Sequence, residues 1–361
     1  MAMTHRKKIL LVDLGSPMGG VEVYIQNLSS MLREHTTVLC LCALPELARR
    51  LRNNGVKVFL IPHFGPGLKG LRFLVALGVL PILILRENVK IVQFNGFLEA
   101  AFLIPSRLLG CEAIYTQHGA FEHHLYRWYQ SPRRYFPRLL ARLCIRFASH
   151  VVCVSEVTGR IVRGVVPLER TSVIPNWVSC IPPYQRMSRS SGTDINLLYV
   201  GRLERYKGLH LLLTAMRSLP GARLTVVGDG SYRRELEHLS AGLDVHFEGF
   251  QSDPGRYYTE ADIFVMPSLG PEGLPMVSIE AMAHGLPCIF SDLDVHREIT
   301  ASGTAGMLFA SGDAENLRET LSTLMEETGL RSAYSRAAYR RVEEVYNPEI
   351  ALKSYVWAFG L

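Results

Sequence analysis

Short apolar runs alternate with amphipathic stretches along the whole chain. A short apolar run bounded by polar residues is typical of a buried parallel strand, and the stretches between have helical spacing. The pattern therefore predicts an α/β protein built from strand–helix units on parallel sheets. The strands expected in the first half are Ile9–Leu14, Thr37–Leu41, Val58–Ile61, Ile91–Phe94, Ala113–Thr116, Val151–Val154 and Ser172–Ile174. Those expected in the second half are Ile195–Val200, Arg223–Val227, Val245–Phe247, Ile263–Met266, Cys288–Phe290 and Met307–Phe309. Helical spacing is clear over Val21–Glu34 and Leu98–Leu109.

The series is interrupted once, by a polar, serine-rich stretch that opens with Pro182-Pro183 and ends near Gly192. Such a stretch is typical of an interdomain linker. With 361 residues the chain is also too long for one ordinary core. We therefore expect a first Rossmann-like domain over residues 1–181, a linker over 182–193, a second Rossmann-like domain over 194–345 and a final helix over 346–361.

Composition and charge refine this picture. The chain is 48% hydrophobic and 20% charged, as expected of a globular protein. Its net charge of +6 combines about +12 in residues 1–180 with about −6 in the remainder, which suggests a polyanion or an anionic membrane surface as a partner of the first half. The seven cysteines are scattered without a CxxC pair, so neither a zinc site nor a disulfide framework is expected and the cytoplasm is the predicted compartment.

Two segments of the first half bear on a membrane. Phe73–Leu85 is strongly apolar but too short to span a bilayer, so it is interpreted as a buried or an interfacial helix. Tyr126–Phe147 carries arginines at every fourth residue, namely Arg134, Arg138, Arg142 and Arg146. Apolar residues lie on another side of the predicted helix, namely Phe136, Leu139, Leu140, Leu143 and Phe147. A core-packed helix and a membrane-contacting helix both fit this pattern. The charge of the half favours the membrane, and nucleic acid is disfavoured because no reader motif accompanies the charge.

The strongest chemical motif places Glu272 and Glu280 on either side of a predicted helix start near Met276. Residues eight apart in a continuous helix would be about 12 Å apart, so the pair is unlikely to share a proton or a metal. Two separate hydroxyl-bearing groups, such as a sugar and a ribose, could instead be held, with the amides at the helix start meeting a diphosphate. The alternative is one loop glutamate and one solvated helix glutamate.

A second motif, Gly201-Arg202 followed by Lys207-Gly208, comes directly after the first strand of the second half. Two cations at the carboxyl edge of a sheet can stabilise the charge that a leaving diphosphate gains. Taken alone, the motif could also be an ordinary basic loop.

Weaker signals lie at other strand ends. Gly19-Gly20 would let the backbone approach a ligand before a helix start, but no dinucleotide or phosphate-loop fingerprint is present. His118 follows a predicted strand and could bond a sugar hydroxyl. Gly228 and Gly230 mark another strand-end turn.

These motifs, together with Ser155-Glu156 and Ile174-Pro175-Asn176, occur in an order that resembles the retaining glycosyltransferases of family 4. The resemblance implies the GT-B fold, in which two Rossmann-like domains with parallel sheets face a central cleft and the last helix crosses back to the first domain. Leu274-Pro275 departs from the aromatic and glycine that many members carry, which puts the donor-sugar preference in doubt.

The resemblance also implies roles for individual residues. Glu272, His118, Arg202 and Lys207 would be catalytic, with Glu272 near the 3-hydroxyl of the transferred sugar and the two cations on the diphosphate. Glu280 would hold the ribose. The remaining donor-binding residues would be Gly19, Gly20, Gly201, Gly230, Gly273, Leu274, Pro275 and Met276. Glu22 and Glu122 are the acceptor-binding candidates, and no metal ligand is predicted.

The implied activity is metal-independent, retaining transfer of a hexose from a UDP- or GDP-sugar to a saccharide or lipid-linked acceptor, in bacterial cell-surface polysaccharide or glycolipid assembly. No cofactor is expected beyond the nucleotide-sugar donor as co-substrate. The expected location is the cytoplasm, on the inner face of its membrane if the first domain docks there. A nucleotide-sugar-binding protein without transferase activity and a GT-B epimerase remain as alternatives.

Overall fold

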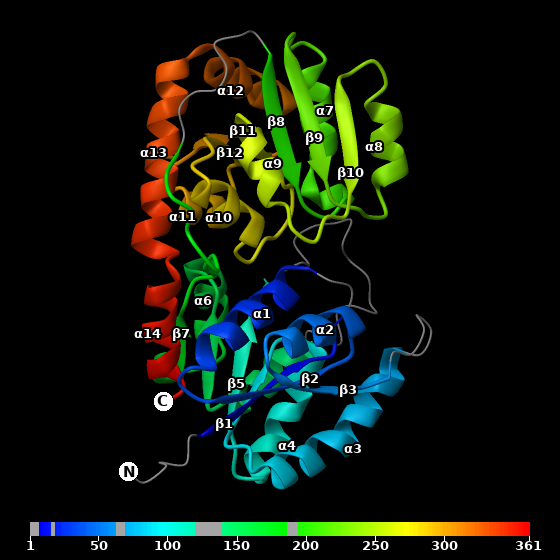
Figure 1. Cartoon of the computed structure of the whole chain (residues 1–361), viewed down its shortest axis with the longest axis vertical. Coiled ribbons are helices and arrows are strands. Elements are labelled where there is room, and N and C mark those ends of the chain that lie inside the picture. The colour runs from blue at the N-terminus through cyan, green and yellow to red at the C-terminus, as the bar shows by residue number, and fades with distance from the viewer. Residues whose placement is uncertain (1–6, 16–18, 63–68, 120–138, 186–193) are drawn as a thin grey trace. The chain divides into compact units, whose positions relative to one another are not determined.

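The computed structural model describes residues 7–15, 19–62, 69–119, 139–185 and 194–361. The chain divides into two compact units. Unit 1 comprises Met1–Asn176 together with Pro348–Leu361, and unit 2 comprises Trp177–Asn347. Both units appear in Figure 1.

Unit 1 is built on a seven-stranded sheet in the order β3-β2-β1-β4-β5-β6-β7. Every neighbouring pair of strands is parallel. The strands are β1 (Lys8–Asp13), β2 (Thr37–Cys42), β3 (Lys57–Leu60), β4 (Ile91–Phe94), β5 (Glu112–Gln117), β6 (His150–Cys153) and β7 (Thr171–Val173). The helices are α1 (Gly20–Leu32), α2 (Pro45–Asn53), α3 (Lys69–Glu87), α4 (Leu103–Leu108), α6 (Glu156–Arg163) and α14 (Pro348–Ala358), with short 3-10 turns at Leu98–Phe102, Ile145–Phe147 and Leu168–Arg170.

The last helix, α14, is anchored to unit 1 by a buried hydroxyl network. The hydroxyls of Tyr24 on α1 and Tyr355 on α14 lie 2.7 Å apart, and Gln93 donates to the Tyr24 hydroxyl at 2.8 Å. Buried hydroxyls need such partners. The network therefore ties residues at opposite ends of the chain into one core.

Unit 2 has a six-stranded parallel sheet in the order β10-β9-β8-β11-β12-β13. The strands are β8 (Ile195–Val200), β9 (Ala222–Val227), β10 (Val245–Gly249), β11 (Ile263–Met266), β12 (Cys288–Ser291) and β13 (Met307–Phe309). The helices are α7 (Leu209–Met216), α8 (Arg233–Leu239), α9 (Gly255–Glu260), α10 (Met276–Ala283), α11 (Asp294–Ile299), α12 (Ala314–Glu326) and α13 (Thr328–Val345), with a 3-10 turn at Arg205–Lys207.

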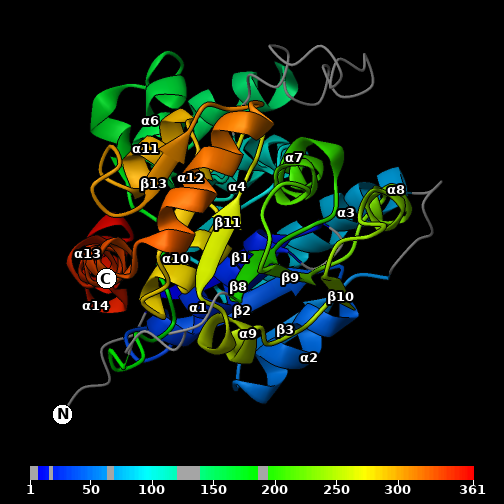
Figure 2. The same cartoon turned by 90° about the horizontal axis from the view of Figure 1, so that it is seen from above.

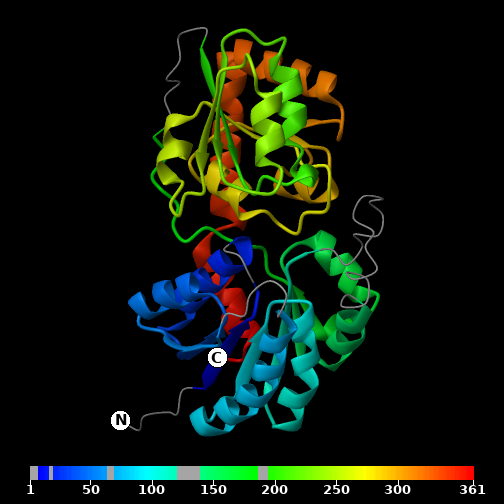
Figure 3. The same ribbon diagram turned by 90° about the vertical axis from the view of Figure 1, so that its right-hand side faces the viewer.

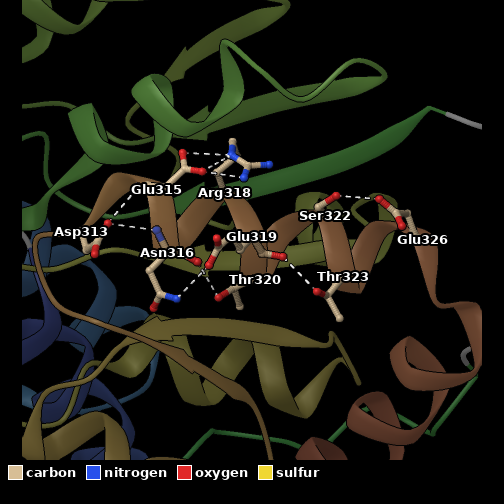
Figure 4. A network of polar contacts seen from close by, with 9 residues as sticks. All are labelled: Asp313, Glu315, Asn316, Arg318, Glu319, Thr320, Ser322, Thr323 and Glu326. Atoms are coloured by element: carbon tan, nitrogen blue, oxygen red, sulfur yellow. Dashed lines mark hydrogen bonds and ion pairs between the residues drawn. The ribbon is translucent and has the colours of Figure 1, made fainter.

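Apolar residues of α7, α8 and α12 share one core cluster with the sheet of unit 2. Figure 2 labels these helices and the strands of this sheet. The start of α12 is capped by Asp313, whose carboxylate accepts hydrogen bonds from the amides of Glu315 and Asn316 (Figure 4). Such a cap satisfies amides that have no partner inside the helix.

The prediction of two parallel α/β sheets is confirmed, since each of the thirteen expected strands is present within about a residue or two of its predicted position. The predicted helix Leu98–Leu109 is instead a 3-10 turn followed by α4.

In the described part of Tyr126–Phe147, most of the predicted apolar side is exposed. Leu139, Leu143 and Phe147 are exposed and Leu140 packs partly against the core, while Ala141, Cys144 and Ile145 are buried. Of the two interpretations of this segment, the core-packed helix therefore does not hold for the three exposed residues, and membrane contact stays a prediction. Arg134, Arg138 and Phe136 lie outside the described residues.

Candidate functional site

The candidate site of unit 2 lies where β8 and β11 end. These strands are neighbours in the sheet although β9 and β10 separate them in the chain. The loops that follow them therefore leave the same carboxyl edge side by side, which is where open α/β sheets bind ligands. One loop carries Arg202 and Lys207, and the other carries Glu272.

Glycines allow the loop after β8 to pack closely. A Cβ on Gly208 would lie 1.8 Å from the Pro267 carbonyl oxygen, and Gly208 has φ +72°, in the left-handed region. A Cβ on Gly230 would lie 2.3 Å from the carbonyl oxygen of Leu203. No side chain fits at either position, so these glycines bring three loops into direct backbone contact.

Lys207 and Glu272 form a buried ion pair across the two loops. The Lys207 Nζ lies 2.7 Å from Oε1 and 2.9 Å from Oε2 of Glu272, and the Ser268 hydroxyl donates to the same carboxylate at 2.8 Å. The two charged side chains are only 12% and 8% exposed. A desolvated ammonium and carboxylate are thus held at fixed positions at the sheet edge, with charge-assisted bonds on both carboxylate oxygens.

Arg202 differs from Lys207 because it is exposed. Its Nη2 donates to the Tyr206 hydroxyl at 2.7 Å, and the ring of Tyr206 also lies 5.3 Å from the Lys207 Nζ. Tyr206 therefore contacts both cations of the motif.

Glu280 lies one turn inside α10, as predicted, and has different partners from Glu272. Its Oε2 accepts a hydrogen bond from the Tyr258 hydroxyl at 2.8 Å. Burial raises the pKa of the Glu280 carboxyl, and the Tyr258 hydrogen bond opposes that shift. The ring of His284 stacks on Tyr258 at 5.2 Å. Within the described residues, no hydrogen bond or ion pair joins Glu280 to Glu272.

The segment leading into α10 also follows the prediction. Gly273 and Pro275 are partly exposed, Leu274 is buried, and Met276 begins the helix. The α10 start lies between the two glutamates in sequence, and Pro275 at its N-cap makes no side-chain hydrogen bond.

Sequence reasoning missed a buried chain of polar groups beneath Glu272. The Ser291 hydroxyl donates to the Ser268 carbonyl at 2.6 Å, and the Nδ1 of His296 donates to the Ser291 carbonyl at 2.8 Å. Burial lowers the pKa of His296 to about 4, so its ring is neutral. The signal that could have identified these buried polar groups was a polar residue at the end of an apolar strand, as Ser291 ends β12.

In unit 1, the candidate residues lie at the carboxyl edge around β1, β4 and β5, which are adjacent in the sheet. Gly19 precedes α1 and Gly20 begins it. Glu22 is buried in the first turn of α1. His118 follows β5 and its Nε2 lies 3.1 Å from the Asn95 side-chain oxygen. Glu122 lies outside the described residues.

Two buried carboxyl groups at this edge also went unpredicted. Glu99 accepts hydrogen bonds from the amides of Leu14, Asn95 and Gly96 at 2.6, 3.1 and 3.0 Å. Burial raises the pKa of Glu99 to about 8 and that of Asp13 to about 6, and the negative charge of Asp13 adds to the shift of Glu99. Glu99 thereby links the segment that follows β1 to the segment that follows β4.

Two parallel α/β units, each with polar groups at the carboxyl edge of its sheet, define the GT-B fold class. Solved structures agree over nearly the whole chain. Anabaena Alr3699/HepE in complex with UDP-glucose matches with a TM-score of 0.83 at 20% identity, covering 98% of this chain and 99% of that one. Sucrose-phosphate synthase from Thermosynechococcus elongatus matches with a TM-score of 0.81 at 20% identity, covering 98% and 100%.

Family models assign both halves. Residues 18–180 match the model for glycosyltransferase family 4, and residues 183–341 match the model for glycosyl transferases group 1. The chain therefore belongs to the family 4, group 1 glycosyltransferases, as the sequence motifs indicated.

Curated relatives match over shorter segments. The sulfoquinovosyl transferase SQD2 of Arabidopsis thaliana is 35% identical over 164 residues, which is 44% of this chain and 32% of that protein. The phosphatidyl-myo-inositol mannosyltransferase of Mycobacterium leprae is 34% identical over 155 residues, 40% of this chain and 41% of that protein. The matches thus span a third to under half of these relatives' length.

Proposed function

We propose that this protein transfers a hexose from a UDP- or GDP-sugar to a saccharide or lipid-linked acceptor, with retention of anomeric configuration. The observation that carries the proposal is the buried Lys207–Glu272 pair beside the exposed Arg202, at the carboxyl edge of the unit 2 sheet. The relatives' names, a sulfoquinovosyl transferase and a phosphatidyl-myo-inositol mannosyltransferase, specify sugar transfer, in the second case with a lipid named, and a structural neighbour was solved in complex with UDP-glucose; both support the proposal.

In this proposal the cations act on the leaving group. As the bond between the anomeric carbon and the diphosphate oxygen breaks, negative charge grows on the diphosphate, and Arg202 and Lys207 stabilise it. The acceptor oxygen forms the new bond on the same face, and its proton passes to the leaving phosphate. Glu272 holds a hydroxyl of the transferred sugar, Glu280 holds the ribose, and His118 is assigned to a sugar hydroxyl.

The backbone would complete the donor site. Gly201 and Gly230 let the loops approach the nucleotide, while Gly273, Leu274, Pro275 and Met276 present the start of α10 to the diphosphate. Gly19 and Gly20 are also assigned to donor binding, and Glu22 and Glu122 to acceptor binding. Two protein cations supply the charge that a divalent ion supplies elsewhere, so the proposed reaction needs no metal.

Nucleotide-sugar turnover tests the proposal. UDP-, GDP- and ADP-sugars are first compared by thermal shift, and release of nucleoside diphosphate is then measured with any sugar that binds. We expect slow hydrolysis of one donor, unaffected by EDTA and lost in Glu272→Ala. Lys207→Ala tests the role of the cations. Its matched control is Arg223→Gln, which removes an exposed arginine near the amino end of β9.

Each other outcome has a distinct meaning. Binding without release of nucleoside diphosphate, even with acceptors present, indicates a nucleotide-sugar-binding protein. Conversion of one donor sugar into its epimer indicates an epimerase. Equal losses in Arg223→Gln and Lys207→Ala would show that the loss does not arise at the proposed site.

The proposal places the enzyme on the cytoplasmic side of a membrane, in assembly of cell-surface polysaccharide or glycolipid, with unit 1 docked on anionic lipid. Helix α3 supports this docking because its outer face is apolar. Leu74 and Leu85 are 66% and 68% exposed, and Leu71, Leu77 and Ile82 are exposed on the same face. No helix among the described residues is long and apolar enough to cross a membrane.

Neighbouring elements extend this apolar surface. Helix α4 packs beside α3 and exposes Leu108, as Figure 3 shows for the two helices. The turn that ends at Phe147 adds exposed apolar and arginine side chains. A face that mixes leucines with arginines fits an anionic bilayer interface, where apolar groups insert and cations meet headgroups.

Liposome flotation tests the docking. We expect the chain to float with vesicles containing phosphatidylglycerol more than with phosphatidylcholine alone, and Leu74→Gln/Leu85→Gln to reduce flotation. Leu168→Gln, which alters another leucine that is 64% exposed, is the control. Salt-insensitive absence of binding to both kinds of vesicle would refute this part of the proposal.

A further inference from the structure

Asn95 is held rigidly at the carboxyl edge of the unit 1 sheet, directly after β4. It is buried, its backbone amide donates to Glu99 Oε2 at 3.1 Å, and its side-chain Nδ2 donates to the Val12 carbonyl at 3.1 Å. Its Oδ1 lies 3.1 Å from the Nε2 of His118. Asn95 therefore joins β1, β4 and the residue after β5.

These contacts determine which atom of each side chain is which. A backbone carbonyl can only accept, so the Asn95 atom facing Val12 must be the amide nitrogen, and its oxygen must face His118. That oxygen can only accept, so the His118 Nε2 must carry a proton. In a neutral imidazole the other nitrogen, Nδ1, is then an acceptor.

We propose that Asn95 is a positioning residue that holds His118 in its Nε2–H tautomer and so makes Nδ1 a hydrogen-bond acceptor for a hydroxyl of a bound sugar. The inference rests on the proposed function, since that function supplies the sugar. A sugar hydroxyl would donate to Nδ1, and a sugar lacking that hydroxyl would leave the acceptor unpaired.

The surroundings of His118 support a neutral ring. Burial lowers its pKa to about 3, so protonation does not compete at neutral pH. The ring of Tyr24 meets the imidazole in a T-shaped contact at 4.5 Å and restricts its rotation.

The tautomer can be observed without any ligand. Long-range proton–nitrogen NMR of the full chain with ¹⁵N-histidine distinguishes a protonated from an unprotonated ring nitrogen, and His118→Gln assigns the signal. We expect an Nε2–H, unprotonated Nδ1 pattern from about pH 5 to 8 in the native chain, and a mixture of tautomers in Asn95→Leu. An Nδ1–H pattern in the native chain would overturn the inference.

Kinetics then test which nitrogen meets the sugar. UDP-glucose, UDP-galactose, UDP-N-acetylglucosamine and GDP-mannose are the donor probes. His118→Asn places an amide near the position of Nδ1, whereas His118→Gln places one near Nε2, so His118→Asn should keep more kcat/KM. Asn95→Leu should lose about 10-fold in kcat/KM, while Asn54→Leu, at the end of α2, should lose none.

Equal loss in His118→Asn and His118→Gln, or unchanged kinetics in Asn95→Leu despite a changed tautomer, would overturn the inference. If no donor binds or turns over, the proposed function fails, and the NMR result alone then decides the role of Asn95.

Discussion

The Lys207–Glu272 ion pair provides a quantitative test of the unit 2 site. Removing one partner of a fully buried pair costs about 3–5 kcal/mol, because an uncompensated charge remains. The two side chains are 12% and 8% exposed, and Ser268 still bonds the carboxylate when the lysine is removed. We therefore expect Lys207→Met to lower the free energy of unfolding by about 2–3 kcal/mol.

The double variant Lys207→Met/Glu272→Gln should be more stable than Lys207→Met alone, since the buried charge is then gone. A coupling energy of about 1–3 kcal/mol is expected from the cycle with Glu272→Gln. In a unit of this size, about 2–3 kcal/mol corresponds to a fall of roughly 4–12 °C in Tm.

Calorimetry of the full chain with all four variants measures these values. The exposed pair Arg223–Asp244, taken through the same cycle, is the control and should give at most about 1 kcal/mol. A coupling energy for Lys207 and Glu272 below about 0.5 kcal/mol would refute the assignment of a desolvated pair in the unliganded protein.

Three further outcomes are expected. Gly208→Ala should lower the free energy of unfolding by more than about 2 kcal/mol, because φ is +72° and the added Cβ would overlap the Pro267 carbonyl. Gly242→Ala, with φ +81° and open space around it, should lower it by about 1 kcal/mol, and equal losses measured by urea denaturation would contradict the close packing. Tyr258→Phe removes a hydrogen bond that lowers the pKa of Glu280, so donor affinity measured by calorimetric titration should begin to fall at a higher pH as the solution is acidified; an unshifted pH profile would argue against Glu280 holding the donor as a carboxylate. The raised pKa values of Asp13 and Glu99 mean that the native state binds more protons than the unfolded state, so their contribution to stability is full below about pH 4 and is lost as the pH rises through about 6 and 8. In Glu99→Gln the unfolding free energy should therefore depend less on pH in this window, and an unchanged slope would show that Glu99 does not titrate there.

The local pattern of the chain was enough to predict the elements. An apolar run of strand length and a helix of amphipathic spacing are properties of neighbouring residues, so all thirteen strands could be placed before any tertiary contact was known. The start of α10 near Met276 was equally local, because Pro275 fits the beginning of a helix and not its interior. The motif at Gly201-Arg202 and Lys207 likewise identified a cationic loop at a strand end.

Partners across the sheet could not be predicted in this way. Lys207 and Glu272 are 65 residues apart and meet because β8 pairs with β11, and Asn95 reaches His118 because β4 pairs with β5. The order of strands in a sheet depends on how the whole sheet packs, so it cannot be predicted from the sequence around a single residue. The same holds for the outer face of α3. The sequence allowed a buried or an interfacial helix, and only the packing of the opposite face in the core of unit 1 shows which of its leucines are exposed.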